Sequence, residues 1–182
     1  MNRFVIITAA GPDRPGIVAG ITRVLYKTGC NIEDTSMTLL RGEFAMMLIV
    51  QLPQRLKIQE LEHHFKAVKK SLGLALLIKP LSVKEARRNQ KPAGHPFILS
   101  VYGSDHPGIV YRVTRLLTSR AINVTDMNTR VIGPVRKPIY VMVLEVEIPE
   151  KIRIEGLKTA LRTLQKAVKV DIALHPVESA QF

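Results

Sequence analysis

The sequence repeats itself, and this repeat constrains the fold more than any other feature. The block from Gly11 to Asp34 aligns with the block from Gly103 to Asp126 at a constant offset of 92, with 11 identities in 24 positions. Further along, Phe44 to Pro53 aligns with Tyr140 to Pro149 at an offset of 96. Because a fixed internal period indicates repeated structural units, the 182-residue chain is predicted to contain the same small fold twice.

The repeat divides the chain into a first domain over residues 1–81, a linker over residues 82–96 and a second domain over residues 97–182. The linker is polar and basic and is closed by Pro and Gly, which is typical of a solvated connection. The change of offset means that the second copy has four additional residues, around Gly133 to Pro138. That insertion is expected at the turn between two strands of the second copy.

Apolar spacing predicts the order strand, helix, strand, strand, helix, strand in each copy. In the first copy, strands are expected at Phe4–Thr8, Asn31–Leu40, Phe44–Leu52 and Leu74–Ile78. The second helix of each copy is marked by apolar residues at i, i+4, i+7 and i+11: Leu61, Phe65, Val68 and Leu72, and Leu157, Leu161, Leu164 and Val168. This βαββαβ order is that of the ferredoxin-like unit, an α+β fold with one antiparallel sheet and both helices on one face.

The other face of each sheet is left uncovered and contains many apolar residues. We therefore expect the two units to pair within the chain, and the chain to form a homodimer.

The first helix of each copy follows a loop with the pattern G-x-D-x-P-G-I-V. Asp13 and Asp105 are predicted to be the N-caps, with Pro15 and Pro107 in the first turn. Gly29 is predicted to end the first helix, whereas the second copy has Ala121 at that position.

Cysteine and hydropathy exclude several classes of protein. The lone Cys30 can form neither an internal disulfide nor a cysteine zinc site. The longest apolar run, Ala45 to Val50, is far shorter than the roughly 18 residues needed to span a bilayer, and the start of the chain lacks the pattern of a secretory leader. The five histidines do not converge in the sequence, so no metal site is predicted. We expect a cytoplasmic protein without a cofactor or membrane segment.

Signatures of catalysis are incomplete in both copies. Ser104, Asp105 and His106 are consecutive and cannot line up as a hydrolase triad, and the first copy has Arg14 in place of the histidine. The pair Gly11 and Gly16 has the glycine spacing of a phosphate-binding loop, but apolar residues stand where the lysine and hydroxyl are needed. No catalytic residue is therefore predicted, and the chain is not expected to be an enzyme.

The net charge of +12 raises the alternative of nucleic-acid binding. An RNA-recognition module has the same element order and stacks bases on aromatic residues of its third strand. Here Glu43, Ala45 and Leu48 occupy the aromatic positions, which argues against direct nucleic-acid binding. A basic protein that binds nucleic acid through helix faces stays open, with Arg153, Lys158, Arg162 and Lys166 as examples.

The duplicated loop is the strongest candidate for a binding site. A glycine-flanked turn that leads into a helix exposes backbone N–H groups and the positive end of the helix dipole, which together favour a carboxylate. The alternative is purely structural: the aspartates cap the helix and the glycines turn the chain. Retention of the whole pattern in two copies that differ at most other positions favours binding.

Each copy resembles the ACT domain, a small-molecule-sensing unit of amino-acid metabolism. The resemblance lies in a strand followed by D-x-P-G-I-V, then a helix, and then N-[IV]-x-D on the next strand. The resemblance implies an amino-acid site between paired units, formed by the loop before the first helix and a neighbouring unit's second strand. The implied roles are a carboxylate held by N–H groups near Gly16 and Gly108, and an ammonium held by Asn31, Asn123 or an aspartate. The implied ligand-binding residues are Gly11, Asp13, Arg14, Gly16, Ile17, Val18 and Asn31 in the first copy, and Gly103, Asp105, His106, Gly108, Ile109, Val110 and Asn123 in the second.

The difference between Arg14 and His106 predicts that the two sites need not be equivalent. Similarity to tandem regulators of this family implies a non-enzymatic protein that binds a small amino acid, with glycine as a candidate, and acts through a protein partner. That partner is either a transcription regulator or a metabolic enzyme, and in the second case the chain is a free-standing regulatory subunit.

Overall fold

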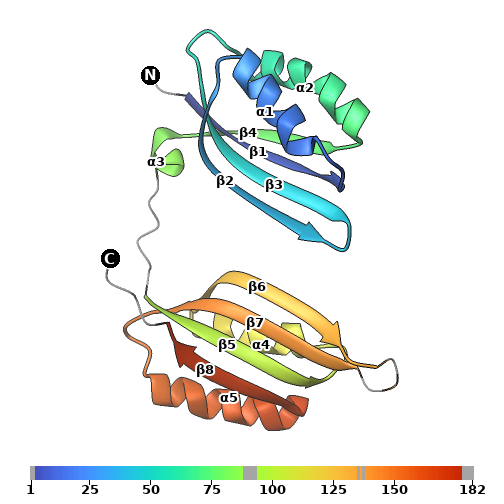
Figure 1. Cartoon of the computed structure of the whole chain (residues 1–182). Helices are drawn as coiled ribbons and strands as arrows, with labels where there is room; N and C mark the ends of the chain where they lie inside the picture. The colour runs from blue at the N-terminus through green and yellow to red at the C-terminus, as the bar shows by residue number, and fades with distance from the viewer. Residues whose placement is uncertain (1–2, 88–93, 135, 137, 178–182) are drawn as a thin grey trace. The chain divides into compact units, whose positions relative to one another are not determined.

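The computed structural model describes residues 3–87, 94–134, 136 and 138–177. The chain divides into two compact units, Met1–Asn89 and Gln90–Phe182, and each is described by itself. Figure 1 shows the same arrangement of strands and helices in both.

The first unit is a four-stranded antiparallel sheet in the order β2-β3-β1-β4. Helices α1 and α2 cover one face of this sheet (Figure 1). The elements are β1 (Arg3–Pro12), α1 (Ile17–Lys27), β2 (Asn31–Leu40), β3 (Glu43–Leu52), α2 (Ile58–Leu72), β4 (Ala75–Leu81) and the one-turn helix α3 (Val83–Ala86).

The second unit has the same topology, with strand order β6-β7-β5-β8 and helices α4 and α5 on one face. Its elements are β5 (His95–Ser104), α4 (Ile109–Thr118), β6 (Asn123–Ile132), β7 (Ile139–Ile148), α5 (Ile154–Val168) and β8 (Val170–Pro176). The predicted α+β architecture of two ferredoxin-like units is therefore confirmed.

Side-chain alternation explains why each sheet buries one face. On β3, Phe44, Met46, Leu48, Val50 and Leu52 are buried beneath the helices, while the residues between them are not. Leu61 and Phe65 of α2 are fully buried against this layer. Burial of each such side chain contributes about 1.5–3 kcal/mol, so the helix layer and the sheet stabilise one another.

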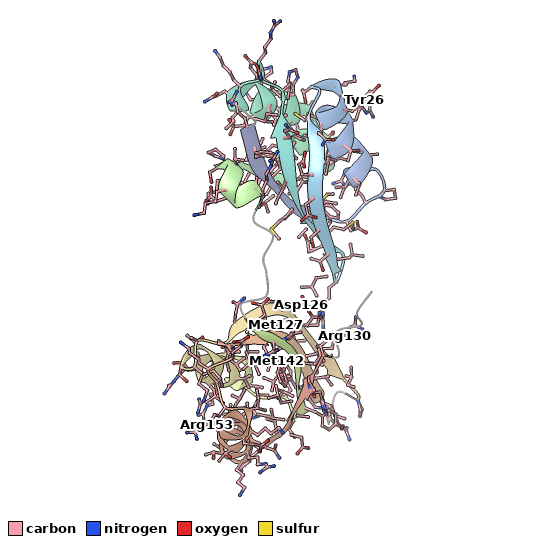
Figure 2. The ribbon with its side chains drawn as sticks, turned by 90° about the vertical axis from the view of Figure 1, so that its left-hand side faces the viewer. Tyr26, Asp126, Met127, Arg130, Met142 and Arg153 are labelled. Atoms are coloured by element: carbon pink, nitrogen blue, oxygen red, sulfur yellow. The ribbon has the colours of Figure 1, made fainter. Side chains whose placement is uncertain are left out.

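The edge strands β2 and β6 are the exception, because the helices do not extend over them. All ten residues of β2 are exposed. Each edge strand also has a bulge at the same place, between Ile32 and Asp34 in β2 and between Val124 and Asp126 in β6. Met127 and Arg130 lie on β6, beside Met142 of β7 (Figure 2). Apolar side chains of β2 and β6 therefore remain available at an open sheet edge.

The predicted N-caps are wrong. Gly16 and Gly108 are the N-caps, with φ of 95° and 97°, and no side chain caps either helix. Asp13 instead donates its backbone N–H to the Gly42 carbonyl oxygen at 2.8 Å, and Pro15 lies before the helix. The reason is that Asp13 is bonded to the β2–β3 turn before the helix begins, and the residue that starts the helix has a positive φ, which favours glycine.

The predicted linker falls partly on described residues. Helix α3 occupies residues 83–86, and β5 begins at His95. Residues 88–93 lie outside the described part of the chain, so the linker boundaries stay a prediction. The same holds for residues 135 and 137 of the insertion between β6 and β7. Within the described ranges, no helix combines the length and the apolar character needed to cross a bilayer.

Candidate functional site

A surface cavity of about 550 Å³ lies between the β1–α1 loop and the neighbouring strands of the first unit. Five of the residues proposed from the sequence line it: Asp13, Arg14, Gly16, Ile17 and Val18. The strands contribute Met37 from β2 and Phe44 from β3, which we call the floor of the cavity. The remaining lining residues are Pro15, Ala19 and Thr22.

One wall of this cavity is the amino-terminal end of α1. The first bond within the helix runs from the Gly20 N–H to the Gly16 carbonyl oxygen at 2.8 Å. The N–H groups of Ile17, Val18 and Ala19 therefore have no acceptor within the helix, and no side chain caps them. Three free donors at the positive end of a helix dipole, all on lining residues, can hold an anionic group such as a carboxylate.

The loop is held in place by a contact that the sequence did not reveal. Arg14 donates from Nη1 to the Ser71 carbonyl oxygen at 3.4 Å, in the last turn of α2. In the second unit, His106 Nε2 lies 2.7 Å from the Val168 carbonyl oxygen, in the last turn of α5. Both side chains donate to the carboxyl end of the second helix, where donors and positive charge are favourable. The exchange of Arg for His therefore does not by itself make the two loops different.

Two of the proposed residues in each unit do not join the loop. A Cβ on Gly11 would lie 2.8 Å from the Gly73 carbonyl oxygen, and one on Gly103 would lie 2.9 Å from Val170 Cγ1. Gly11 permits the close approach of the α2–β4 connection, and Gly103 permits the close approach of β8. Asn31 pairs with Gln51, at the opposite end of β3 from Phe44, and donates to Glu33 Oε1 at 2.9 Å. Asn123 takes the equivalent place opposite Glu147.

The loop of the second unit repeats the backbone geometry at the start of the first helix. Arg112 donates its N–H to the Gly108 carbonyl oxygen at 3.0 Å, so the N–H groups of the three preceding residues, which include Ile109 and Val110, are free in the same way. Asp105 precedes the helix, as Asp13 does in the first unit. By the alignment of the copies, Thr129 and Tyr140 take the floor positions of Met37 and Phe44.

The floor residues were missed from the sequence, although a signal existed. Met37 pairs with the buried Met46, and Thr129 pairs with the buried Met142, so both point to the helix side of their sheets. Strand alternation, counted from the buried residues of the neighbouring strand, would have found them. The bulge before each of them shifts that alternation by one residue. Counting every second residue from Asn31 without the bulge would therefore place Met37 on the wrong face of the sheet.

Over the described residues, His, Cys, Asp and Glu side chains nowhere form a group of three that could bind a metal ion. The only cysteine, Cys30, is half-buried, and burial raises the pKa of its thiol despite a hydrogen bond with Thr28.

The fold and the duplicated loop define a class of protein made of two ferredoxin-like units. In each unit, a loop beside an open sheet edge leads into the first helix. Models of the ACT domain match residues 3–79 and 97–168. The chain belongs to the ACT-domain family and contains two ACT domains in tandem.

Relatives of known sequence share one or both units. A UPF0237 protein of Methanopyrus kandleri is 38% identical over 82 residues, which cover 44% of this chain and 91% of that protein. The glycine cleavage system transcriptional repressor of Escherichia coli is 29% identical over 129 residues, which cover 71% of this chain and 65% of the repressor. The chain is thus related to a transcriptional repressor, and the match spans slightly under two thirds of the repressor's length.

Solved structures reproduce the tandem fold. The crystal structure of an unknown protein from Galdieria sulphuraria matches with a TM-score of 0.78 and 25% identity, over 97% of this chain and 99% of that chain. The crystal structure of a putative glycine cleavage system transcriptional repressor matches with a TM-score of 0.73 and 19% identity, over 97% and 98% of the two chains. The second likeness concerns the fold alone.

Proposed function

We propose that this protein is a non-enzymatic regulator that binds a small amino acid at the loop before the first helix of each unit. The observation that carries the proposal is the cavity wall formed by the free N–H groups of Ile17, Val18 and Ala19, with the Asp13 carboxylate at the same cavity. An α-amino acid presents a carboxylate and an ammonium a few ångströms apart. The helix end suits the first group, and Asp13 suits the second.

Pairing of units would complete the site. Asn31 lies outside the cavity of its own unit, so its proposed contact with the ligand needs the second strand of a neighbouring unit. The exposed edge strand β2, with Met37 and Leu39 more than half exposed, supports such pairing within the chain or in a homodimer. The name of the related repressor makes glycine the first ligand to test.

A protein partner would transmit the bound state. Helix α1 contains Arg23 and Lys27 and no acidic residue, and α4 contains Arg112 and Arg115 and no acidic residue. None of these four cations has an ion pair with a described residue. The unpaired positive charge on α1 and α4 supports an acidic partner, either a transcription regulator or an enzyme of amino-acid metabolism.

Nucleic-acid binding is the second candidate, favoured by the same helix charge. The sheet of the first unit gives it no support, because Phe44 is 2% exposed and faces the helices instead of the open face. The outer face of β1 and β3 presents Ile6, Thr8, Ala45, Met47 and Ile49, which offer no aromatic ring for stacking.

Titration calorimetry of the full chain against each of the twenty amino acids tests the proposal. We expect at least one amino acid to bind, and a ligand at 100 times its Kd to add about 2.7 kcal/mol of stability in a thermal-shift assay. Asp13→Asn should weaken binding to the first unit by about tenfold or more, because a hydrogen bond to a charged group contributes about 1.5–3 kcal/mol.

Glu62→Gln is the matched control, since Glu62 is an exposed carboxylate on α2, outside the cavity. It should leave binding unchanged. The absence of binding by any amino acid, together with tight and salt-sensitive binding of RNA or DNA, would establish the second candidate instead.

A further inference from the structure

The two loops are alike in backbone, but the floors beneath them differ in chemistry. Gly16 and Gly108 have nearly identical dihedral angles, with φ of 95° and 97° and ψ of −5° and −6°. The floor of the first unit is Met37 and Phe44, and the second unit has Thr129 and Tyr140 at the equivalent positions. Both floor residues thus change from apolar to hydroxyl-bearing between the copies.

The register of the sheets shows that these positions are equivalent in space within each unit. Met37 lies opposite Met46 in the first unit, and Thr129 lies opposite Met142 in the second. Phe44 and Tyr140 are each paired with a glycine of the first strand, Gly11 and Gly103. The exchange of side chains is therefore not offset by a shift of the strands.

The first floor can offer dispersion contacts and the weakly accepting sulfur of Met37, but no hydrogen-bond donor from its side-chain ends. Phe44 is 2% exposed, and Met37 is 54% exposed at the open edge. A phenyl ring and a flexible thioether favour an aliphatic side chain, and such a surface discriminates weakly against an isostere that carries a hydroxyl.

The second floor is built around a buried phenol. Tyr140 is 9% exposed, and its hydroxyl donates to Met142 Sδ at 3.8 Å, which is a weak acceptor. Burial raises the pKa of Tyr140, a hydrogen bond with the Thr129 side chain lowers it, and the charge of the Asp105 carboxylate raises it. A ligand oxygen would be a stronger acceptor for the phenol than the thioether.

We propose that the two units prefer amino acids of different side-chain polarity: an aliphatic side chain in the first, and an uncharged side chain with a hydroxyl or carboxamide in the second. An acidic side chain is disfavoured in the second unit because it would lie near Asp105. This inference rests on the proposed function, since it assigns the ligand class of the same two sites.

Threonine and valine are nearly isosteric and give the sharpest comparison. In full-length protein with Asp13→Asn, which leaves the second site intact, calorimetry should show threonine binding at least tenfold more tightly than valine. With Asp105→Asn, which leaves the first site, valine should bind as well as threonine or better. The asymmetry is expected because a site built to hydrogen-bond a hydroxyl rejects the analogue that lacks it.

Exchange of the floors tests which residues are responsible. Tyr140→Phe with Thr129→Val, in the Asp13→Asn background, should remove the threonine preference while circular dichroism stays unchanged. Tyr140→Phe alone keeps the ring and its packing, and it should remove part of the preference even if the double variant is unstable. Thr125→Val is the matched control, because Thr125 lies in the bulge of β6, away from the floor, and it should keep the preference.

The outcomes separate the two proposals. If both sites bind amino acids with the same threonine-to-valine ratio, or if Tyr140→Phe leaves that ratio unchanged, the polarity inference is overturned and the proposed function stands. If no amino acid binds at either site, both are overturned.

Discussion

At the residue scale, the duplication provides an internal comparison of left-handed positions. Gly29 follows α1 with φ of 69°, and Ala121 follows α4 with φ of 54°. In both units the next residue donates to the carbonyl oxygen five positions earlier, from Cys30 to Leu25 at 2.9 Å and from Ile122 to Leu117 at 3.1 Å. The backbone adopts the same helix end in both units, but only one of them has the residue that suits it.

We predict that Ala121→Gly stabilises the second unit. A left-handed conformation costs a residue with a Cβ about 1–2 kcal/mol, whereas glycine adds about 0.4–1 kcal/mol of unfolded-chain entropy. The expected net gain is about 0.5–1 kcal/mol in urea unfolding followed by circular dichroism. The converse variant, Gly29→Ala, should destabilise the first unit by a similar amount through backbone strain. A steric clash should add nothing, because the new Cβ would meet only Pro53, at 3.9 Å. A loss of stability on Ala121→Gly would show that the Cβ contributes packing that outweighs the backbone strain.

At the element scale, α3 is the shortest helix of the described chain and depends on its cap. Glu85 Oε2 accepts from the Ser82 N–H at 2.8 Å and from the Ser82 hydroxyl at 2.7 Å, and the Ser82 hydroxyl oxygen accepts from the Glu85 N–H at 3.2 Å. The Ser82 hydroxyl and then its N–H lower the pKa of Glu85. This reciprocal cap is local and has the pattern S-x-x-E, within the segment that was predicted to be a linker.

We predict that α3 loses its cap at acidic pH. Because the pKa of Glu85 is lower in the folded helix than in the unfolded chain, the cap is fully present above the ordinary glutamate pKa of about 4.3 and is lost as the pH falls through the lowered value. The amide resonance of Ser82, followed by NMR between pH 7 and pH 2, should shift with that midpoint. Glu85→Gln should abolish the titration of this resonance, and a midpoint at or above the ordinary value would contradict the prediction.

At the scale of the whole molecule, the two units have separate cores. The buried apolar residues of the first cluster all lie between Val5 and Ile78, and those of the second all lie between Phe97 and Val170. The two clusters share no residue. Each sheet likewise has all four strands from its own unit. A domain with its own core and complete sheet has what it needs to fold independently.

We predict that fragments 1–89 and 90–182 each fold alone. Both should give dispersed NMR spectra and a cooperative thermal transition, and their summed spectra should reproduce most resonances of the full chain. Resonances that differ would identify contacts between the units. A collapsed fragment without cooperative unfolding would show that one unit depends on the other, for example through an edge strand.

Much of the fold was predictable because its signals are local. The period of apolar residues identified each strand and helix, and the offset of 92 established that the second unit repeats the first. The candidate site was predictable in part: Asp13, Gly16 and Val18 were found from a loop motif, and they do line one cavity. Gly11 and Asn31 belong to the same proposed set, but within one unit they lie outside this cavity.

The sequence by itself thus determined the duplication, the βαββαβ order and the position of the loop, since repeats, periodicity and turn residues are properties of neighbours along the chain. Only the tertiary structure decided that glycines and not aspartates cap the first helices, that Arg14 and His106 both bind the end of the second helix, and that Met37 and Thr129 lie beneath the loops. These features join residues far apart in sequence. They follow from how the helices pack on the sheet and how a bulge resets the faces of an edge strand, which no local pattern contains.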